Sequence, residues 1–175
     1  MIGLRIFNVW KIPGPKKWSM LLWKIFNNAL PTGYEFLRRN IGTIHHRHLC
    51  NDPNQTETLD HLFRDCPIVD RIWLGTDLGI HFQNGNNISV TEWIANWLKT
   101  LHTKNTRYKG VIAFMATIWT IGCTHNDRLF RGDPLFFSKI FNIWAEMITT
   151  VLKAGISSLK KQGCSSQDTI NPIEN

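Results

Sequence analysis

The sequence predicts a mostly α-helical protein, and two kinds of signal support this fold class. Apolar residues recur at steps of three and four along most of the 175-residue chain, as they do on one face of a helix. Helix-start signals, in which Ser or Thr is followed three residues later by Glu, occur at Thr32/Glu35 and Ser89/Glu92. No stretch has the alternating pattern of a half-buried strand. Hydrophobic residues make up 43% of the chain, so a sizeable core is expected.

The first half of the chain contains several short predicted elements separated by turn residues. Apolar side chains share one helical face in residues 16–29, and Pro31 ends that helix. The sequence NDPNQ at 51–55 is rich in residues that favour turns. In chain order we expect a helix over 16–29, a short helix from Thr32 to Arg39, a turn over 51–55, a helix over 57–63 and a helix beginning at Pro67.

The second half is predicted to be a helical segment with longer elements. The sequence NGNN at 84–87 is the clearest loop, and it marks a boundary between a domain at 1–80 and a helical segment at 88–161. Residues 162–175 are polar and are expected to form a disordered tail. Within the segment we expect a helix over 89–101, a buried helix over 108–121 closed by a polar turn at 125–127, and an amphipathic helix beginning at Asp133-Pro134.

Positive charge is concentrated at the start of the chain. The formal net charge is +7, and residues 1–50 hold eight Lys or Arg but a single acid, Glu35. Clustered Lys and Arg are typical of proteins that bind polyanions, because they displace counterions from phosphates. The alternative is a solvated face that keeps the protein soluble. The candidate phosphate-binding residues, with one Trp for base contact, are Lys11, Lys16, Lys17, Arg38, Arg39, Arg47 and Trp18.

A cluster of possible metal ligands lies between residues 45 and 66. Cys50, His61 and Cys66 fall within 17 positions, and His46 and His48 precede them. Zinc binds four Cys or His side chains tetrahedrally, commonly a close pair on a turn and a second pair at a helix. The alternative is buried free thiols beside solvated histidines. The pattern therefore predicts a zinc-finger-like loop within a small helical domain, followed by a further helical segment.

A longer pattern of residues resembles a known family. The string Glu-Thr-x-x-His-Leu-Phe-x-x-Cys at 57–66 is its most specific part. The resemblance is to the reverse-transcriptase zinc-binding domain of plant non-LTR (LINE-type) retroelements, over about residues 8–75 and more loosely over 110–150. The other matching positions are Trp10, Pro15-Lys16, Trp23, Leu30-Pro31-Thr32, Leu37, Arg39 and Trp73.

One position departs from the family pattern. The resemblance implies zinc ligands at Cys50, His61 and Cys66, but Arg47 stands where the family has the first Cys of a Cys-x-x-Cys pair. A guanidinium stays protonated and cannot bind zinc. The fourth ligand is expected from His46 or His48, with a water-completed three-ligand site or no site as alternatives.

The resemblance implies a non-catalytic, nucleic-acid-binding fragment of a retroelement reverse transcriptase polyprotein. RNA or DNA would bind with little sequence readout, and no small-molecule substrate is expected. The chain has no pair of adjacent aspartates of the kind that polymerases use to hold two metal ions. The alternative is a degenerate or domesticated retroelement fragment that mediates protein contacts through its helices or has no selected function. The oligomeric state is left open.

Composition also bears on location. The longest nearly apolar run, residues 111–123, is shorter than the ~20 residues that a membrane-spanning helix needs. Four cysteines are too few for a disulfide scaffold and favour reduced thiols or metal ligands. We therefore expect an intracellular protein without membrane association, and the family's role favours the nucleus.

Overall fold

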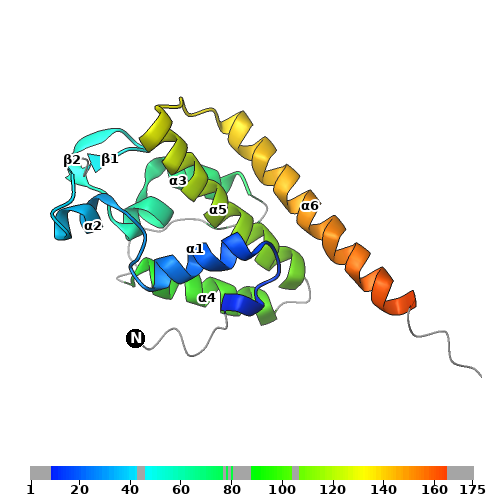
Figure 1. Ribbon diagram of the computed structural model, residues 1–175. Coiled ribbons are helices and arrows are strands. Elements are labelled where there is room, and N and C mark those ends of the chain that lie inside the picture. Colours follow the sequence, from blue (N-terminus) through cyan, green and yellow to red (C-terminus); the bar gives the residue numbers. More distant parts are fainter. Residues whose placement is uncertain are drawn as a thin grey trace, which may run out of the picture.

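The fold is mostly α-helical, as predicted. The computed structural model describes residues 9–42, 46–76, 78, 80, 88–103 and 107–164. Helices dominate Figure 1, and a single two-stranded hairpin is present in the described part of the chain. In chain order the elements are η2 (Val9–Lys11), α1 (Lys16–Phe26), α2 (Gly33–Arg38), β1 (His46–Arg47), β2 (Asp52–Thr56), η3 (His61–Asp65), α3 (Pro67–Leu74), α4 (Val90–Thr103), α5 (Arg107–Arg131) and α6 (Phe137–Cys164).

Helix α5 is the centre of the fold. It contacts α1, α3, α4, α6 and η3, so helices surround it on most sides (Figure 1). Three aromatic side chains meet at its middle: the ring centroid of Phe114 lies 5.1 Å from that of Trp73 and 5.9 Å from that of Trp93. Residues 111–121 of α5 are apolar on nearly all sides, and a central position removes most of their side chains from water.

Both predicted helix starts are confirmed, one of them completely. At α4 the Ser89 hydroxyl accepts from the Glu92 N–H at 3.3 Å, and the Glu92 carboxylate accepts from the Ser89 N–H at 3.2 Å. At α2 the Thr32 hydroxyl accepts from the Glu35 N–H at 3.4 Å, but the Glu35 carboxylate binds Arg38 instead. Each cap satisfies an N–H group that the helix itself leaves without a partner.

The turn predicted over 51–55 is wrong, because most of these residues form strand β2. It pairs antiparallel with β1, with His46 opposite Thr56 and Arg47 opposite Asp52. The chain reverses over residues 48–51 instead, and Asn51 takes a left-handed φ of 56° there. This hairpin has no apolar face to bury, so it lacks the alternating pattern by which strands are recognised.

Helix α5 is longer than predicted. Residues 125–127 were expected to form a closing turn, but they lie inside α5, which continues to Arg131 and ends before Gly132 at φ 67°. A buried partner for His125, described below, makes its polar ring compatible with a helix interior.

The other boundaries in this half differ by a few residues. Helix α6 begins at Phe137 rather than at Asp133-Pro134, and it ends at Cys164, three residues past 161. The loop at 84–87 and residues 165–175 lie outside the described residues.

Helix α6 is held against α3 and α5 by specific contacts. The Trp144 indole N–H donates to the Thr117 hydroxyl at 3.0 Å, and the Arg71 guanidinium lies 4.4 Å from the centroid of the Phe137 ring. A Cβ atom at Gly75 would fall 2.0 Å from the Phe141 ring, so a larger residue there would push α6 away. Within the described residues no helix combines the length and the apolar character needed to cross a membrane.

Candidate metal centre

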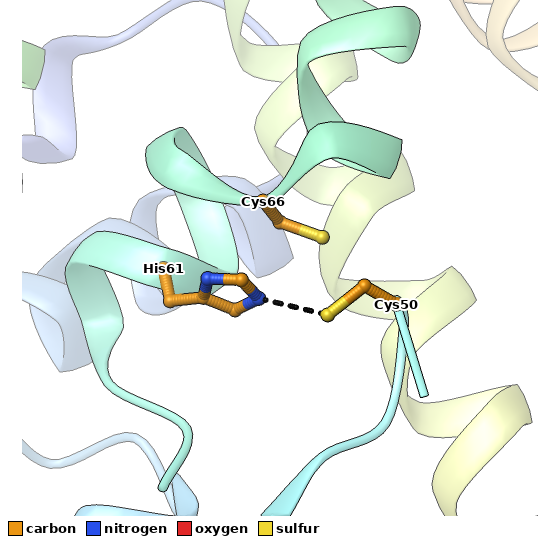
Figure 2. Close-up of side chains that lie close together, drawn as sticks. All are labelled: Cys50, His61 and Cys66. Atoms are coloured by element: carbon orange, nitrogen blue, oxygen red, sulfur yellow. Dashed lines mark hydrogen bonds between the residues drawn. The ribbon is translucent and has the colours of Figure 1, made fainter. Parts of the chain in front are cut away.

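Three side chains from three different elements converge on one point. Cys50 lies in the turn between β1 and β2, His61 opens η3, and Cys66 is the residue immediately before α3. Their ligand atoms all lie within 4.8 Å of one another, and Figure 2 shows the imidazole and the two sulfurs directed toward a shared space. We call residues 46–66, which carry this group, the metal loop.

The distance between two of these ligand atoms fits a tetrahedral zinc ion. The Cys50 Sγ and His61 Nε2 atoms are 3.4 Å apart. Ligands at typical Zn–S and Zn–N bond lengths and tetrahedral angles lie roughly 3.5 Å apart. Two thiols and an imidazole also form a donor set that binds zinc in preference to magnesium or calcium. The residues present therefore suit zinc.

The local sequence explains why His61 and Cys66 meet. The His61 N–H donates to the Thr58 hydroxyl at 3.1 Å, and the Cys66 N–H donates to the His61 carbonyl at 3.1 Å. This π-helical turn keeps two side chains five positions apart on one side. Pro67 requires an extended residue before it, and Cys66 has ψ 129°, which ends the turn at the ligand.

Burial favours the electrically neutral forms of His61 and Cys66 in the absence of metal. The pKa of the Cys66 thiol is raised to about 11, chiefly by burial and also by the neighbouring Cys50, against the lowering effect of N–H groups at the start of α3. The pKa of His61 is lowered by burial and then by the positive charge of Arg47. The imidazole is therefore ready to bind a cation, whereas the thiols must lose protons to do so.

The structure brings together three of the five predicted ligands. His46 and His48 are outside the group of Cys50, His61 and Cys66. Their two rings pack on each other with centroids 4.1 Å apart. His46 begins β1 and His48 begins the turn that follows it. The expected fourth imidazole ligand is thus not in place.

Arg47 occupies the position of the missing cysteine without joining the group. Its guanidinium Nη1 lies 3.8 Å from a carboxylate oxygen of Asp52 across the hairpin, and the side chain is 25% exposed. Its charge lowers the pKa of His61, so it lies close enough to disfavour protonation of that ligand. Arg47 therefore replaces a metal ligand with a contact between the two strands.

Sequence reasoning missed a buried polar pair that ties the metal loop to α5. The His125 Nε2 and a Glu57 carboxylate oxygen are 2.5 Å apart, and both side chains are almost fully buried. The His48 ring lies 6.3 Å from that of His125, centroid to centroid. The partners are 68 positions apart, and no local pattern signals a contact at that separation.

The predicted nucleic-acid-binding side chains have different surroundings. Lys11 and Lys16 are exposed, and the Lys17 ammonium lies 4.6 Å from the centroid of the Trp119 ring. Arg38 and Arg39 lie 2.7 and 3.4 Å from the Glu35 carboxylate. These residues, apart from Trp18, keep exposed or half-buried side chains.

Trp18 needs a correction. It is fully buried and therefore is not available to stack on a base. It lies on the inner face of α1 with Leu22 and Ile25, at helical spacing. A Cβ at Gly14, whose φ is 127°, would fall 2.5 Å from its ring, so the chain before α1 closes over the indole. The flanking lysines made Trp18 look like a surface residue.

The comparisons with known proteins point to one family. The model of the family described as zinc-binding in reverse transcriptase matches residues 5–73, close to the predicted 8–75. No curated protein and no solved structure matches the chain significantly. The matched segment contains Cys50, His61 and Cys66, the residues that converge in the structure. Residues 5–73 of this chain are therefore similar to the reverse-transcriptase zinc-binding family.

Proposed function

We propose that this chain is a non-catalytic, nucleic-acid-binding fragment of a non-LTR retroelement reverse transcriptase. The observation that carries the proposal is the convergence of Cys50, His61 and Cys66 inside the segment that matches the zinc-binding family. The strongly basic segment that leads into the metal loop supports binding of RNA or DNA through phosphates, with little sequence readout. A plant origin and a nuclear location follow from the same resemblance.

The site would hold a structural zinc ion. Zinc would crosslink the β1–β2 turn, η3 and the start of α3 through the three ligand side chains. Cys50 and Cys66 would bind as thiolates and His61 through Nε2. The fourth position would be taken by water, because His46 and His48 lie outside the group.

The surroundings of the site support a role without catalysis. A zinc hydrolase needs a carboxylate or imidazole free to act on the metal-bound water. The acids nearest in sequence are engaged elsewhere: Asp52 lies 3.8 Å from Arg47, Glu57 pairs with His125, Asp60 accepts from the Val90 N–H at 2.7 Å, and Asp65 pairs with Arg64 at 2.7 Å. Among the described residues we find no other acid grouped with the three ligands.

A second candidate function has its own observation. Phe130 and Phe136, on either side of the turn between α5 and α6, are 71% and 57% exposed, and Ile143 on α6 is 43% exposed. Exposed large apolar side chains often mark protein contacts. A degenerate or domesticated fragment that acts as a helical interaction module would use this surface rather than the basic segment.

Metal analysis tests the zinc site. Protein purified without chelator should contain close to one zinc per chain, and Cys66→Ala should lower this to background. Cys123→Ala is the matched control, since Cys123 is also a partly buried thiol but lies outside the group. Substituting His46 and His48 by Ala should leave the zinc content unchanged. A folded, metal-free parent protein would contradict the proposal.

Salt dependence tests nucleic-acid binding. The logarithm of the affinity for single-stranded RNA should fall linearly with the logarithm of the salt concentration. For each tenfold rise in salt the fall should be about 0.7 log units per phosphate contact. The assay is fluorescence anisotropy with a labelled oligonucleotide. No detectable binding at low salt would favour the interaction-module alternative.

A further inference from the structure

A pocket opens between α1 and α5, outside the metal centre. Its volume is about 290 Å³. This is close to the lower limit of ~300 Å³ for small-molecule sites, so it is large enough for one flat ring system with part of a sugar. Side chains from both helices line it, among them Lys17, Met20, Lys24, Trp119, Cys123 and Asn126.

The charge around this pocket is positive. Lys17 and Lys24 lie seven positions apart, two turns along the same face of α1. The side chains that line the pocket include no Asp or Glu, and α1 itself contains no acid. An occupant should therefore carry negative charge at the rim of the pocket and an apolar, flat part within it.

Trp119 provides an aromatic surface in the pocket. Its indole is partly buried against the core, and the Lys17 ammonium lies 4.6 Å from its ring centroid. A cation over an exposed ring is a weak contact that a phosphate can take over. Moving Lys17 from the ring to a phosphate would free the indole face for stacking.

We propose that this pocket binds one unpaired nucleotide of a single strand. The base would lie against Trp119 and Met20, with the Asn126 amide near its edge, and the adjoining phosphates would contact Lys17 and Lys24. Single-strand binders commonly combine aromatic platforms with a basic groove in this way. The inference rests on the proposed function and adds to it a specific site.

The pocket is also connected to the metal loop. Leu62 lines it and is the neighbour of His61 in η3, and His125 lines it while its ring contacts the buried Glu57. The loop that zinc would order therefore forms part of the pocket floor. Ordering of the metal loop by zinc would therefore affect the shape of the pocket.

An abasic oligonucleotide tests the base contact. Two labelled single-stranded RNAs of equal length and charge are compared by anisotropy at one salt concentration, one intact and one without bases. Loss of a stacked base should weaken binding at least about fivefold. Equal affinity for the two RNAs would overturn the proposal that the pocket binds a base.

Two lysine pairs provide matched variants. Lys17→Gln/Lys24→Gln removes the pair that lines the pocket, and Lys11→Gln/Lys16→Gln removes the same charge outside it; all four side chains are exposed, so both variants should fold. The Lys17→Gln/Lys24→Gln variant should bind intact RNA at least about five times more weakly than the Lys11→Gln/Lys16→Gln variant does. Its preference for intact over abasic RNA should also disappear.

The outcomes separate the two levels of the proposal. Equal losses from both pairs, with intact and abasic RNA bound alike, would sustain nucleic-acid binding but overturn its assignment to this pocket. Absence of RNA binding by the parent protein would overturn both.

Discussion

The metal loop and the helical core around α5 are stabilised in different ways. In the core, large apolar side chains such as Phe114, Trp73 and Ile118 are fully buried against one another. The metal loop buries polar groups, His61, Glu57 and the Cys66 thiol, beside its apolar Leu49, Leu62 and Phe63. Apolar burial is favourable for almost any close-packed arrangement, whereas buried polar groups stabilise only when each has a partner. The loop should therefore depend on individual contacts and the core on total burial.

Two of the hydrogen bonds that join the regions show this difference. The Trp73 indole N–H donates to the Phe63 carbonyl at 3.0 Å, and Glu57 pairs with His125 of α5. The first belongs to the apolar core and the second to the polar loop. Substitutions at these contacts therefore test the comparison directly.

The largest effect is expected at Trp73. Trp73→Ala should lower the free energy of unfolding by about 3–5 kcal/mol, because it empties a fully buried site and removes the bond to Phe63. Its neighbour Leu74 is 48% exposed, and Leu74→Ala should change it far less. Urea unfolding followed by circular dichroism measures both. Similar losses for the two variants would mean that Trp73 is not a core residue.

The next largest effect is expected in the pH dependence of zinc affinity, which involves the metal loop alone. Because the pKa of Cys66 is raised to about 11, its thiol is protonated at neutral pH and must release a proton to bind zinc. With two thiols, zinc affinity should rise up to about a hundredfold per pH unit, and it should fall as the pH is lowered. Competition with a chromophoric chelator between pH 7 and 8 measures this. An affinity independent of pH would exclude thiolate ligation.

Glu57 gives a smaller effect that links loop and core. Glu57→Gln keeps the side-chain size but removes the charge beside His125, and should lower the free energy of unfolding by about 1–3 kcal/mol. Glu146→Gln, an exposed site on α6, is the control and should have little effect. Thermal unfolding compares them. A loss at Glu57 no larger than at Glu146 would show that the buried pair does not hold the loop.

The smallest effect is expected at the helix caps. Thr32→Ala removes the acceptor for the Glu35 N–H and should lower the free energy of unfolding by about 1 kcal/mol. Ser89→Ala makes the matching change at α4, whose cap has both reciprocal bonds. Comparing the two by urea unfolding shows whether the shorter helix next to the loop relies more on its cap. Unchanged stability in both variants would show that the caps do not contribute to the free energy of unfolding.

Several elements could be predicted because their signals are local. The starts of α2 and α4 depend on residues three positions apart, and the start of α3 depends on Pro67. The ligands Cys50, His61 and Cys66 could be predicted from their family pattern, and the structure brings them together. The hairpin at 46–56 could not be predicted, because its strands have no buried face and so no periodicity.

Other features depend on contacts between distant residues. The burial of Trp18, the extension of α5 through His125 and the exclusion of His46 and His48 from the ligand group are of this kind. The sequence alone determined the helical class, the caps, the basic segment and three candidate metal ligands, because each rests on local spacing, composition or a short family pattern. Tertiary structure alone decided which polar groups are buried together and where a pocket opens, because those outcomes depend on how whole helices pack.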